Sequence, residues 1–210
     1  MTDDRFTSPV ISDSLDAAGR RGQVLAPGIE PLVPGSRLLG RAATVQFAPV
    51  TEDGPDPYED AIAFIDGLRP GEVAVVATGD SARSAFWGEL FSAAAIGRGA
   101  AGIVTDGCLR DSPKIAALGF PAFARGRRPL DYRARMRVVA RAQPVVLGGV
   151  TIRPGELVMA DDDGVAVVPA SVEEQVLARA RARVETESTV LEELLAGDGL
   201  RTVWERHGVL

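Results

Sequence analysis

The chain has 210 residues, of which 46% are hydrophobic and 25% are charged, and its formal net charge is −6. This length suits one domain, residues 1–210, and the composition excludes a largely disordered chain. The sequence contains no apolar run of about 18 residues that could cross a membrane, and its N-terminus lacks the apolar core of a secretory signal. Because Cys108 is the only cysteine, no internal disulfide can form, and we expect a cytoplasmic protein.

The excess of acidic residues argues against a protein that binds nucleic acid. The arginine-rich stretch 125–141 is interleaved with apolar residues, and we interpret it as the solvated edge of a strand. The only histidine, His207, lies close to the C-terminus, which disfavours a Ser-His-Asp triad, a Cys-His pair and a histidine-rich zinc site. Carboxylates, arginines, backbone amides and oxygen-liganded metals remain as carriers of chemistry.

Helix and strand patterns alternate through the first 124 residues. In chain order they predict a helix at 10–22, a strand at 40–47, a helix at 58–68, a strand at 73–77, a helix at 89–99, a strand at 101–105, a helix at 113–118 and a strand at 120–124. We expect Ser12 or Asp13 to cap the first helix. The strands at 73–77, 101–105 and 120–124 should pair in parallel, with right-handed crossovers.

The pattern changes in the last third of the chain. Short strands separated by turn residues predict an antiparallel portion between residues 137 and 168. The Asp-Asp-Asp-Gly sequence at 161–164 is better explained as a hairpin turn than as a calcium loop, because the downstream glutamate of that loop is missing. Ser171 should cap a long helix that ends near Ala196. Together these elements predict an α/β fold with one mixed central sheet, covered by a second sheet and by helices.

Two segments carry residues suited to catalysis. The first ends in Gly88, Glu89, Leu90 and Phe91, where a helix is predicted to begin after a parallel strand. Free amides at such a helix start bind carboxylates and phosphates. The simpler alternative is a strand-to-helix loop in which an acid is favourable near the helix start.

The second segment follows the predicted strand 101–105 and contains Arg110 and Asp111. Asp111 could offer an oxygen ligand to Mg²⁺ or Mn²⁺, and Arg110 could neutralise charge that develops on a substrate oxygen. The simpler alternative is a surface ion pair in which Asp111 or Ser112 caps the next helix. Because both segments follow neighbouring parallel strands, we expect them to lie side by side.

The most specific motif in the chain is an acid, twenty residues and then Arg-Asp, formed here by Glu89, Arg110 and Asp111. With it, the sequence resembles the class II 4-hydroxy-4-methyl-2-oxoglutarate / 4-carboxy-4-hydroxy-2-oxoadipate aldolases and the RraA-like proteins that share their fold. The resemblance covers nearly the whole chain and also rests on residues 12–16, 40–45, 87–90, 102–107, 161–165 and Pro169. The chain departs from the best-known aldolases in having Glu89 where they have aspartate.

The resemblance implies a swivelling β/β/α fold and a homotrimer or hexamer with active sites between subunits. It also implies retro-aldol cleavage of 4-hydroxy-2-oxo diacids that depends on Mg²⁺ or Mn²⁺ and releases pyruvate, with oxaloacetate decarboxylation as a further activity. By position, Asp111 would bind the metal directly. Glu89, and Glu187 from a neighbouring subunit, would bind the metal through water.

The resemblance assigns the small 2-oxo acid substrate to the same two segments. Arg110 would hold the C2 oxygen of the pyruvate unit. The amides of Leu90 and Phe91, which follow Gly88, would hold the carboxylate of that unit. An apolar stripe on the long C-terminal helix could pack against a neighbouring subunit, and it consists of Val176, Leu177, Val184, Leu191, Leu194 and Leu195.

Retro-aldol cleavage generates an enolate, which class I aldolases stabilise through a lysine imine. The only lysine, Lys114, lies in a charged helix start, so we expect a divalent metal in that role and Cys108 to be a packing residue. One alternative function is that of the non-enzymatic RraA-like regulator that binds ribonuclease E, and the presence of Asp111 after the arginine favours the enzyme. Another alternative is a related enzyme that acts on a different 2-oxo or 2-hydroxy acid.

Overall fold

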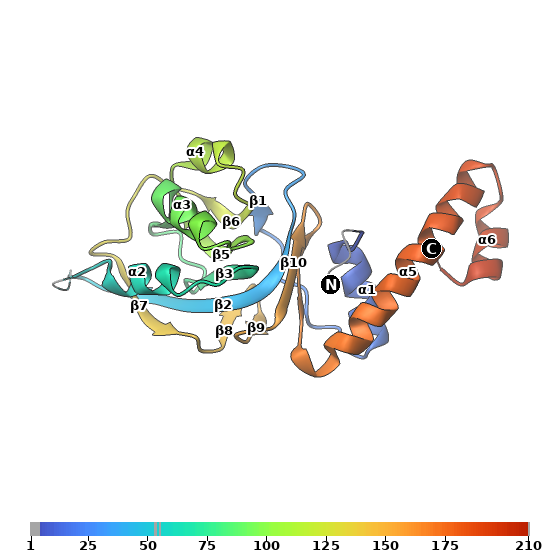
Figure 1. The fold of residues 1–210 in the computed structure, drawn as a ribbon, viewed down its shortest axis with the longest axis horizontal. Coiled ribbons are helices and arrows are strands. Elements are labelled where there is room, and N and C mark those ends of the chain that lie inside the picture. The colour runs from blue at the N-terminus through green and yellow to red at the C-terminus, as the bar shows by residue number, and fades with distance from the viewer. Residues whose placement is uncertain (1–4, 53, 55, 210) are drawn as a thin grey trace.

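The structure, a computed structural model, describes residues 5–52, 54 and 56–209. Within these residues, a nine-stranded mixed sheet has the order β1-β6-β5-β3-β2-β10-β11, while β4 pairs with β5 and β7 pairs with β2 (Figure 1). The elements are α1 (Ser8–Ala17), β1 (Glu30–Pro31), β2 (Leu38–Pro49), α2 (Glu59–Asp66), β3 (Glu72–Ala77), β4 (Ala85–Trp87), α3 (Glu89–Gly97), β5 (Gly102–Leu109), α4 (Ser112–Ala117), β6 (Ala122–Arg127), β7 (Met136–Arg141), β8 (Val145–Leu147), β9 (Val150–Ile152), β10 (Leu157–Asp161), β11 (Gly164–Val168), the 3-10 turn η1 (Ala170–Val172), α5 (Glu173–Leu195) and α6 (Leu200–His207).

The middle of the sheet is parallel, as the sequence predicts. β3 pairs in parallel with both β2 and β5, and β5 pairs in parallel with β6. All eight residues of β5 are buried, because helices cover one face of the sheet and the β8–β9 hairpin covers the other (Figure 1). Burial on both faces explains why residues 73–77 of β3 form a continuous apolar run rather than an alternating one. The predicted antiparallel portion is also present, in β7, β8–β9 and β10–β11.

Three apolar clusters hold the layers together. The first lies under α2, α3 and α4 and includes Phe47, Ile65, Val76, Phe86 and Trp87. The second cluster fills the space between the curled sheet and the β8–β9 hairpin, and the sheet nearly closes around this cluster. Its members include Val75, Val104, Leu147, Ile152 and Val165. The third joins α1 and α5 to β10 and β11 and includes Phe6, Ile11, Met159, Val168 and Val176. The result is an α/β fold with a mixed central sheet, as expected, and this sheet is nearly closed.

Two predicted helix caps are wrong. The Thr7 hydroxyl caps α1 by accepting a hydrogen bond from the Val10 amide at 3.4 Å, whereas Ser12 and Asp13 lie inside the helix. Helix α1 begins earlier than predicted because Pro9 fits its first turn. Ser171 lies within η1, and α5 begins after it at Glu173.

The aspartates between β10 and β11 form the predicted hairpin, in which Asp161 pairs with Gly164. Their carboxylates bind protein groups. Asp161 accepts hydrogen bonds from the Ser8 amide at 2.6 Å and the Ser8 hydroxyl at 2.5 Å, and Asp162 accepts one from the Gly35 amide at 2.9 Å. This turn therefore ties the start of α1 to the sheet.

The apolar stripe on α5 is divided between two environments. Val176 and Val184 are buried in the third cluster of the same chain, and Leu177 packs against it. Leu191 and Leu195 are exposed at the far end of the helix. The prediction that the whole stripe faces a neighbouring subunit is therefore wrong for its first half. Each helix in the described part of the chain is too short or too polar to cross a bilayer.

The largest difference from the sequence prediction concerns the end of β5. The strand continues to Leu109, so Asp106 lies inside it and is buried rather than in a loop. The Asp106 carboxylate accepts hydrogen bonds from the Thr78 amide at 2.6 Å, the Thr78 hydroxyl at 2.8 Å and the Asp80 amide at 2.8 Å. These bonds hold the segment after β3 against β5. The same segment then forms the short strand β4, which the sequence did not predict.

We predict that Asp106→Ala lowers the free energy of unfolding by roughly 3 kcal/mol, because three donors around the buried carboxylate lose their acceptor. Urea denaturation of the wild type and the variant measures the change. Asp66→Ala is the control, since the Asp66 side chain is 59% exposed and pairs only with Arg98 on the surface, and it should cost less than about 0.5 kcal/mol. Equal losses in the two variants would contradict a structural role for Asp106.

Candidate active site

A pocket of about 400 Å³ lies where α2, α3, β4 and the end of β5 meet. It gathers the six residues that the sequence points to within one chain, namely Gly88, Glu89, Leu90, Phe91, Arg110 and Asp111. The other lining residues are Tyr58, Ile62, Ala85, Phe86, Trp87, Lys114, Asp131 and Tyr132. A volume of this size is typical of a site for a small molecule.

The pairing of β4 with β5 brings the two predicted segments together. Trp87 pairs with Leu109, and the Arg110 amide donates a hydrogen bond to the Trp87 carbonyl at 2.9 Å. The Glu89 amide donates to Asp111 Oδ2 at 3.4 Å. The two segments therefore lie side by side, as predicted, but a strand pair rather than two loops joins them.

Gly88 leaves the room that this close approach needs. A Cβ atom at this position would lie 2.7 Å from Asp111 Oδ2 and 3.0 Å from Arg110 Cγ. Its backbone is extended, with φ of −151°, so the absence of a side chain matters here through space rather than through backbone strain.

Helix α3 presents its first amides at this pocket. Its first internal hydrogen bond runs from the Ser92 amide to the Gly88 carbonyl at 3.0 Å, so the amides of Leu90 and Phe91 precede any helical acceptor. The Ser92 hydroxyl accepts a hydrogen bond from Trp87 Nε1 at 2.8 Å, which fixes the helix start against β4. A helix start with free amides favours a bound anion.

Asp111 does not cap α4 with its side chain. It occupies the N-cap position with a left-handed backbone, φ of 56°, and its carboxylate makes no capping hydrogen bond. The carboxylate turns instead toward the Glu89 amide and Arg110, whose Nε lies 3.7 Å from Oδ2. Asp111 therefore stands at the cap position and forms a surface ion pair with Arg110, as the simpler interpretation expects, but its side chain does not cap the helix.

Arg110 also contacts an acid that the sequence analysis missed. Arg110 Nη1 lies 2.6 Å from Asp131 Oδ2, and Tyr58 lines the pocket beside the same carboxyl group. Burial, and then the nearby Asp131 charge, raise the pKa of Tyr58 above its usual value. Tyr132 stacks on Phe86 beneath this group. Asp131 lies in the arginine-rich stretch, where no spacing in the sequence connects it to Arg110.

Lys114 forms an ion pair with Glu89, with 2.7 Å between Nζ and Oε2. The hydrogen bond to Glu89 raises the pKa of Lys114, which keeps the amine protonated. A lysine that forms an imine must instead be neutral, so this pairing agrees with the prediction that Lys114 is not a Schiff-base residue.

Cys108 is buried, and burial raises the pKa of its thiol, as expected for a packing residue.

Glu187 does not line the pocket within its own chain. It lies on α5 and pairs with Arg183 at 2.6 Å, which in turn pairs with Asp13. Figure 1 shows α5 leaving the sheet at the opposite end from α3 and α4. Only a neighbouring subunit could therefore bring Glu187 to this site.

The pocket residues suit a divalent cation for which the protein supplies only part of the coordination shell. Among residues 5–52, 54 and 56–209, no three side chains of His, Cys, Asp or Glu come close enough to enclose a metal. Mg²⁺ commonly keeps several waters and uses only one or two carboxylates together with substrate oxygens. Asp111 and Glu89 supply hard oxygen atoms, and the missing Gly88 side chain leaves space beside Asp111. The donor set therefore fits such an ion.

Comparisons with known proteins show which proteins this chain is similar to. A family model described as "RraA-like: Aldolase/RraA" matches residues 8–167. Protein DlpA of Legionella pneumophila is 30% identical over 198 residues, which cover 94% of this chain and 32% of DlpA. This chain therefore spans about a third of that relative. A Halalkalibacterium halodurans protein named "Putative 4-hydroxy-4-methyl-2-oxoglutarate aldolase" is 36% identical over 177 residues, covering 82% of this chain and 77% of that protein.

The fold agrees with that of a solved relative. RraAS2 of Streptomyces coelicolor, described as an unusual member of the RNase ES inhibitor RraA protein family, matches with a TM-score of 0.82 and 33% identity. The match covers 90% of this chain and 94% of RraAS2. Since the family model also covers more than half of the sequence, the chain belongs to the RraA-like (Aldolase/RraA) family.

Proposed function

We propose that this protein is a cytoplasmic, divalent-metal-dependent lyase. Its substrates are 4-hydroxy-2-oxo diacids of the 4-hydroxy-4-methyl-2-oxoglutarate type, which it cleaves by a retro-aldol reaction to release pyruvate, and it also decarboxylates oxaloacetate. The observation that carries the proposal is the pocket in which Arg110, Asp111 and the first amides of α3 converge. The name of the Halalkalibacterium halodurans relative supports the same reaction class.

In this proposal, the free amides of Leu90 and Phe91 bind the carboxylate next to the 2-oxo group. The Arg110 guanidinium faces the C2 oxygen, where negative charge grows as the C3–C4 bond breaks. Asp131 orients that guanidinium through its 2.6 Å contact with Nη1. The other nitrogens of the planar group remain available as donors to the substrate.

Asp111 would hold the Mg²⁺ or Mn²⁺ ion directly, and Glu89 would hold it through water. When bound, the ion supplies a second positive charge beside the C2 oxygen. The Glu89 side chain is 35% exposed, and that of its partner Lys114 is 64% exposed. Such an exposed pair contributes little to stability, so Glu89 can exchange this partner at small cost.

Asp111→Ala should abolish pyruvate release at ordinary metal concentrations, because the direct metal ligand is lost, and excess Mn²⁺ should rescue it at most in part. Arg110→Lys keeps the charge but loses the planar fork, so it should lower kcat by about 10²–10³-fold. Pyruvate release from oxaloacetate and from 4-hydroxy-4-methyl-2-oxoglutarate, with and without each metal, measures both effects.

Both variants should stay folded, because the two side chains are exposed at a strand end. Thermal unfolding checks this point. If Asp111→Ala keeps full metal-dependent activity, the aldolase proposal fails. A wild type without activity on either substrate would favour the alternative of a non-enzymatic regulator. The description of the Streptomyces coelicolor relative as a member of the RNase ES inhibitor RraA protein family is the observation behind that alternative.

Gly88→Ala should weaken Mn²⁺ binding while leaving the thermal midpoint nearly unchanged. The added methyl group meets the end of the short Asp111 side chain, which can rotate away but then leaves its position beside the α3 amides. The EPR signal of free Mn²⁺ measures the affinity. Gly126→Ala is the matched control, because its Cβ would meet only Cys108 Sγ, at 3.7 Å, and unchanged Mn²⁺ affinity in both variants would argue against a metal beside Gly88.

We further propose that the protein assembles as a homotrimer or hexamer in which Glu187 of a neighbouring subunit completes the site. Figure 1 shows α5 and α6 projecting from the sheet, and four large apolar side chains on the end of α5 and on α6 are exposed in the single chain. They are Leu191, Leu195, Leu200 and Trp204. Exposed apolar groups of this kind are typical of an interface.

Glu187→Gln should lower metal affinity or turnover by about 10–100-fold without unfolding the protein, as expected for a carboxylate that orients metal-bound water. Glu185→Gln, an exposed neighbour on the same helix, should have wild-type kinetics. Sedimentation at micromolar concentration should show a trimer or hexamer for both variants. A 22.1 kDa monomer, or wild-type kinetics for Glu187→Gln, would rule out this part of the proposal.

A further inference from the structure

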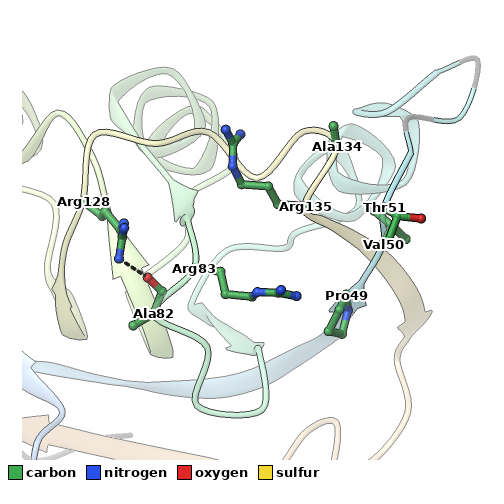
Figure 2. Close-up of a pocket in the computed structure, with 8 residues that line it drawn as sticks. All are labelled: Pro49, Val50, Thr51, Ala82, Arg83, Arg128, Ala134 and Arg135. Carbon is green, nitrogen blue, oxygen red and sulfur yellow. Dashed lines mark hydrogen bonds between the residues drawn. The ribbon is translucent and has the colours of Figure 1, made fainter.

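A second, larger hollow of about 710 Å³ has its own set of lining residues (Figure 2). Its walls come from the end of β2, the segment before β4, the segment after β6 and the segment before β7. The described residues that line it are Pro49, Val50, Thr51, Ala82, Arg83, Arg128, Ala134 and Arg135. None of them lines the active-site pocket.

The hollow is strongly basic in an acidic protein. Arg83, Arg128 and Arg135 contribute three guanidinium groups from three separate segments, and the described lining residues include no acid. The whole chain, by contrast, has a net charge of −6. Three like charges around one open, concave space favour the approach of an anion.

Backbone carbonyls hold two of the three arginines in place. Arg128 Nη1 donates a hydrogen bond to the Ala82 carbonyl at 2.8 Å, as Figure 2 shows. Arg135 Nη1 donates to the carbonyls of Asp131 at 3.0 Å and Arg133 at 3.2 Å. Neutral carbonyls orient a guanidinium without cancelling its charge. Each arginine also has five N–H donors, so most donors on both side chains remain for a ligand.

The backbone before Arg135 is in a conformation that needs support from its surroundings. Ala134 has a φ of 56°, which costs a residue with a Cβ roughly 1 kcal/mol or more. This turn sets the direction of Arg135 along the rim of the hollow. Arg83 reaches across the hollow toward Pro49 (Figure 2), and within the described residues its guanidinium has no hydrogen bond or ion pair.

We propose that this hollow binds a small organic polyanion, a molecule with two or more carboxylate or phosphate groups on a carbon skeleton. The volume falls in the range of small-molecule sites, about 300–1,000 Å³. Guanidinium forks match both anionic groups, and Pro49, Val50 and Ala134 offer apolar contact to the skeleton. One carboxylate would satisfy only part of the three-arginine set.

Isothermal titration of the metal-free protein at fixed ionic strength tests the proposal without any catalytic readout. Citrate serves as the polycarboxylate, fructose 1,6-bisphosphate as the phosphate ester and acetate as the single-charge control. We expect one or both polyanions to bind and acetate not to bind. Arg83→Gln should weaken polyanion binding by about tenfold or more, because the loss of one charge-assisted hydrogen bond typically lowers the affinity by at least that factor.

Arg69→Gln is the matched control, because it removes the same charge from an exposed arginine at the opposite, amino end of β3. It should change the affinity less than twofold. Equal weakening in both variants would indicate diffuse surface charge and overturn the proposal, as would binding of neither polyanion. If Arg83→Gln instead dissociates the oligomer in sedimentation, a neighbouring subunit fills the hollow, and the proposal is likewise overturned.

Discussion

The parallel contact between β4 and β5 is the constraint on which the candidate active site depends. After β3 the chain continues in the same direction along the outer half of β5, as β4, instead of entering a helix directly. The buried Asp106 carboxylate holds the beginning of this segment through Thr78 and Asp80, and the hydrogen bond from Arg110 to Trp87 holds its end. Helix α3 can therefore start only beside Arg110 and Asp111. A buried carboxylate with three donors is costly to disturb, which makes this tie rigid.

The charges in the pocket serve orientation more than stability. Arg110 contacts Asp131 and Asp111, while Lys114 contacts Glu89. These side chains are all partly exposed, and such pairs contribute about 0–1 kcal/mol each. The fold therefore does not need them, whereas a ligand gains from groups whose directions are already set. The arginine-lined hollow follows the same principle with backbone carbonyls as the orienting groups.

Sequence patterns were informative where a pattern repeats along the chain. The continuous apolar run of β3 indicated a strand covered on both faces, and the spacing of Glu89, Arg110 and Asp111 placed three pocket residues on neighbouring strand ends. Strand β4 was missed because three residues between arginine- and glycine-containing segments show no periodicity. Asp131 and Tyr58 were missed because they reach the pocket from segments about 20 and 50 residues away from Arg110 along the chain, with no motif to connect them.

The sequence by itself determined the fold class and the chemical character of the candidate site. A single histidine, a single lysine and the Arg-Asp pair after a buried strand leave carboxylate and arginine chemistry, whatever the detailed geometry. Tertiary structure alone decided which way each side chain turns. Asp111 faces Glu89 rather than the amides of α4 because β4 occupies the edge of β5 and Gly88 leaves space there. The apolar stripe of α5 is divided because α1, distant in sequence, covers only its first half. Both outcomes depend on contacts between segments far apart in the chain, which local patterns do not encode.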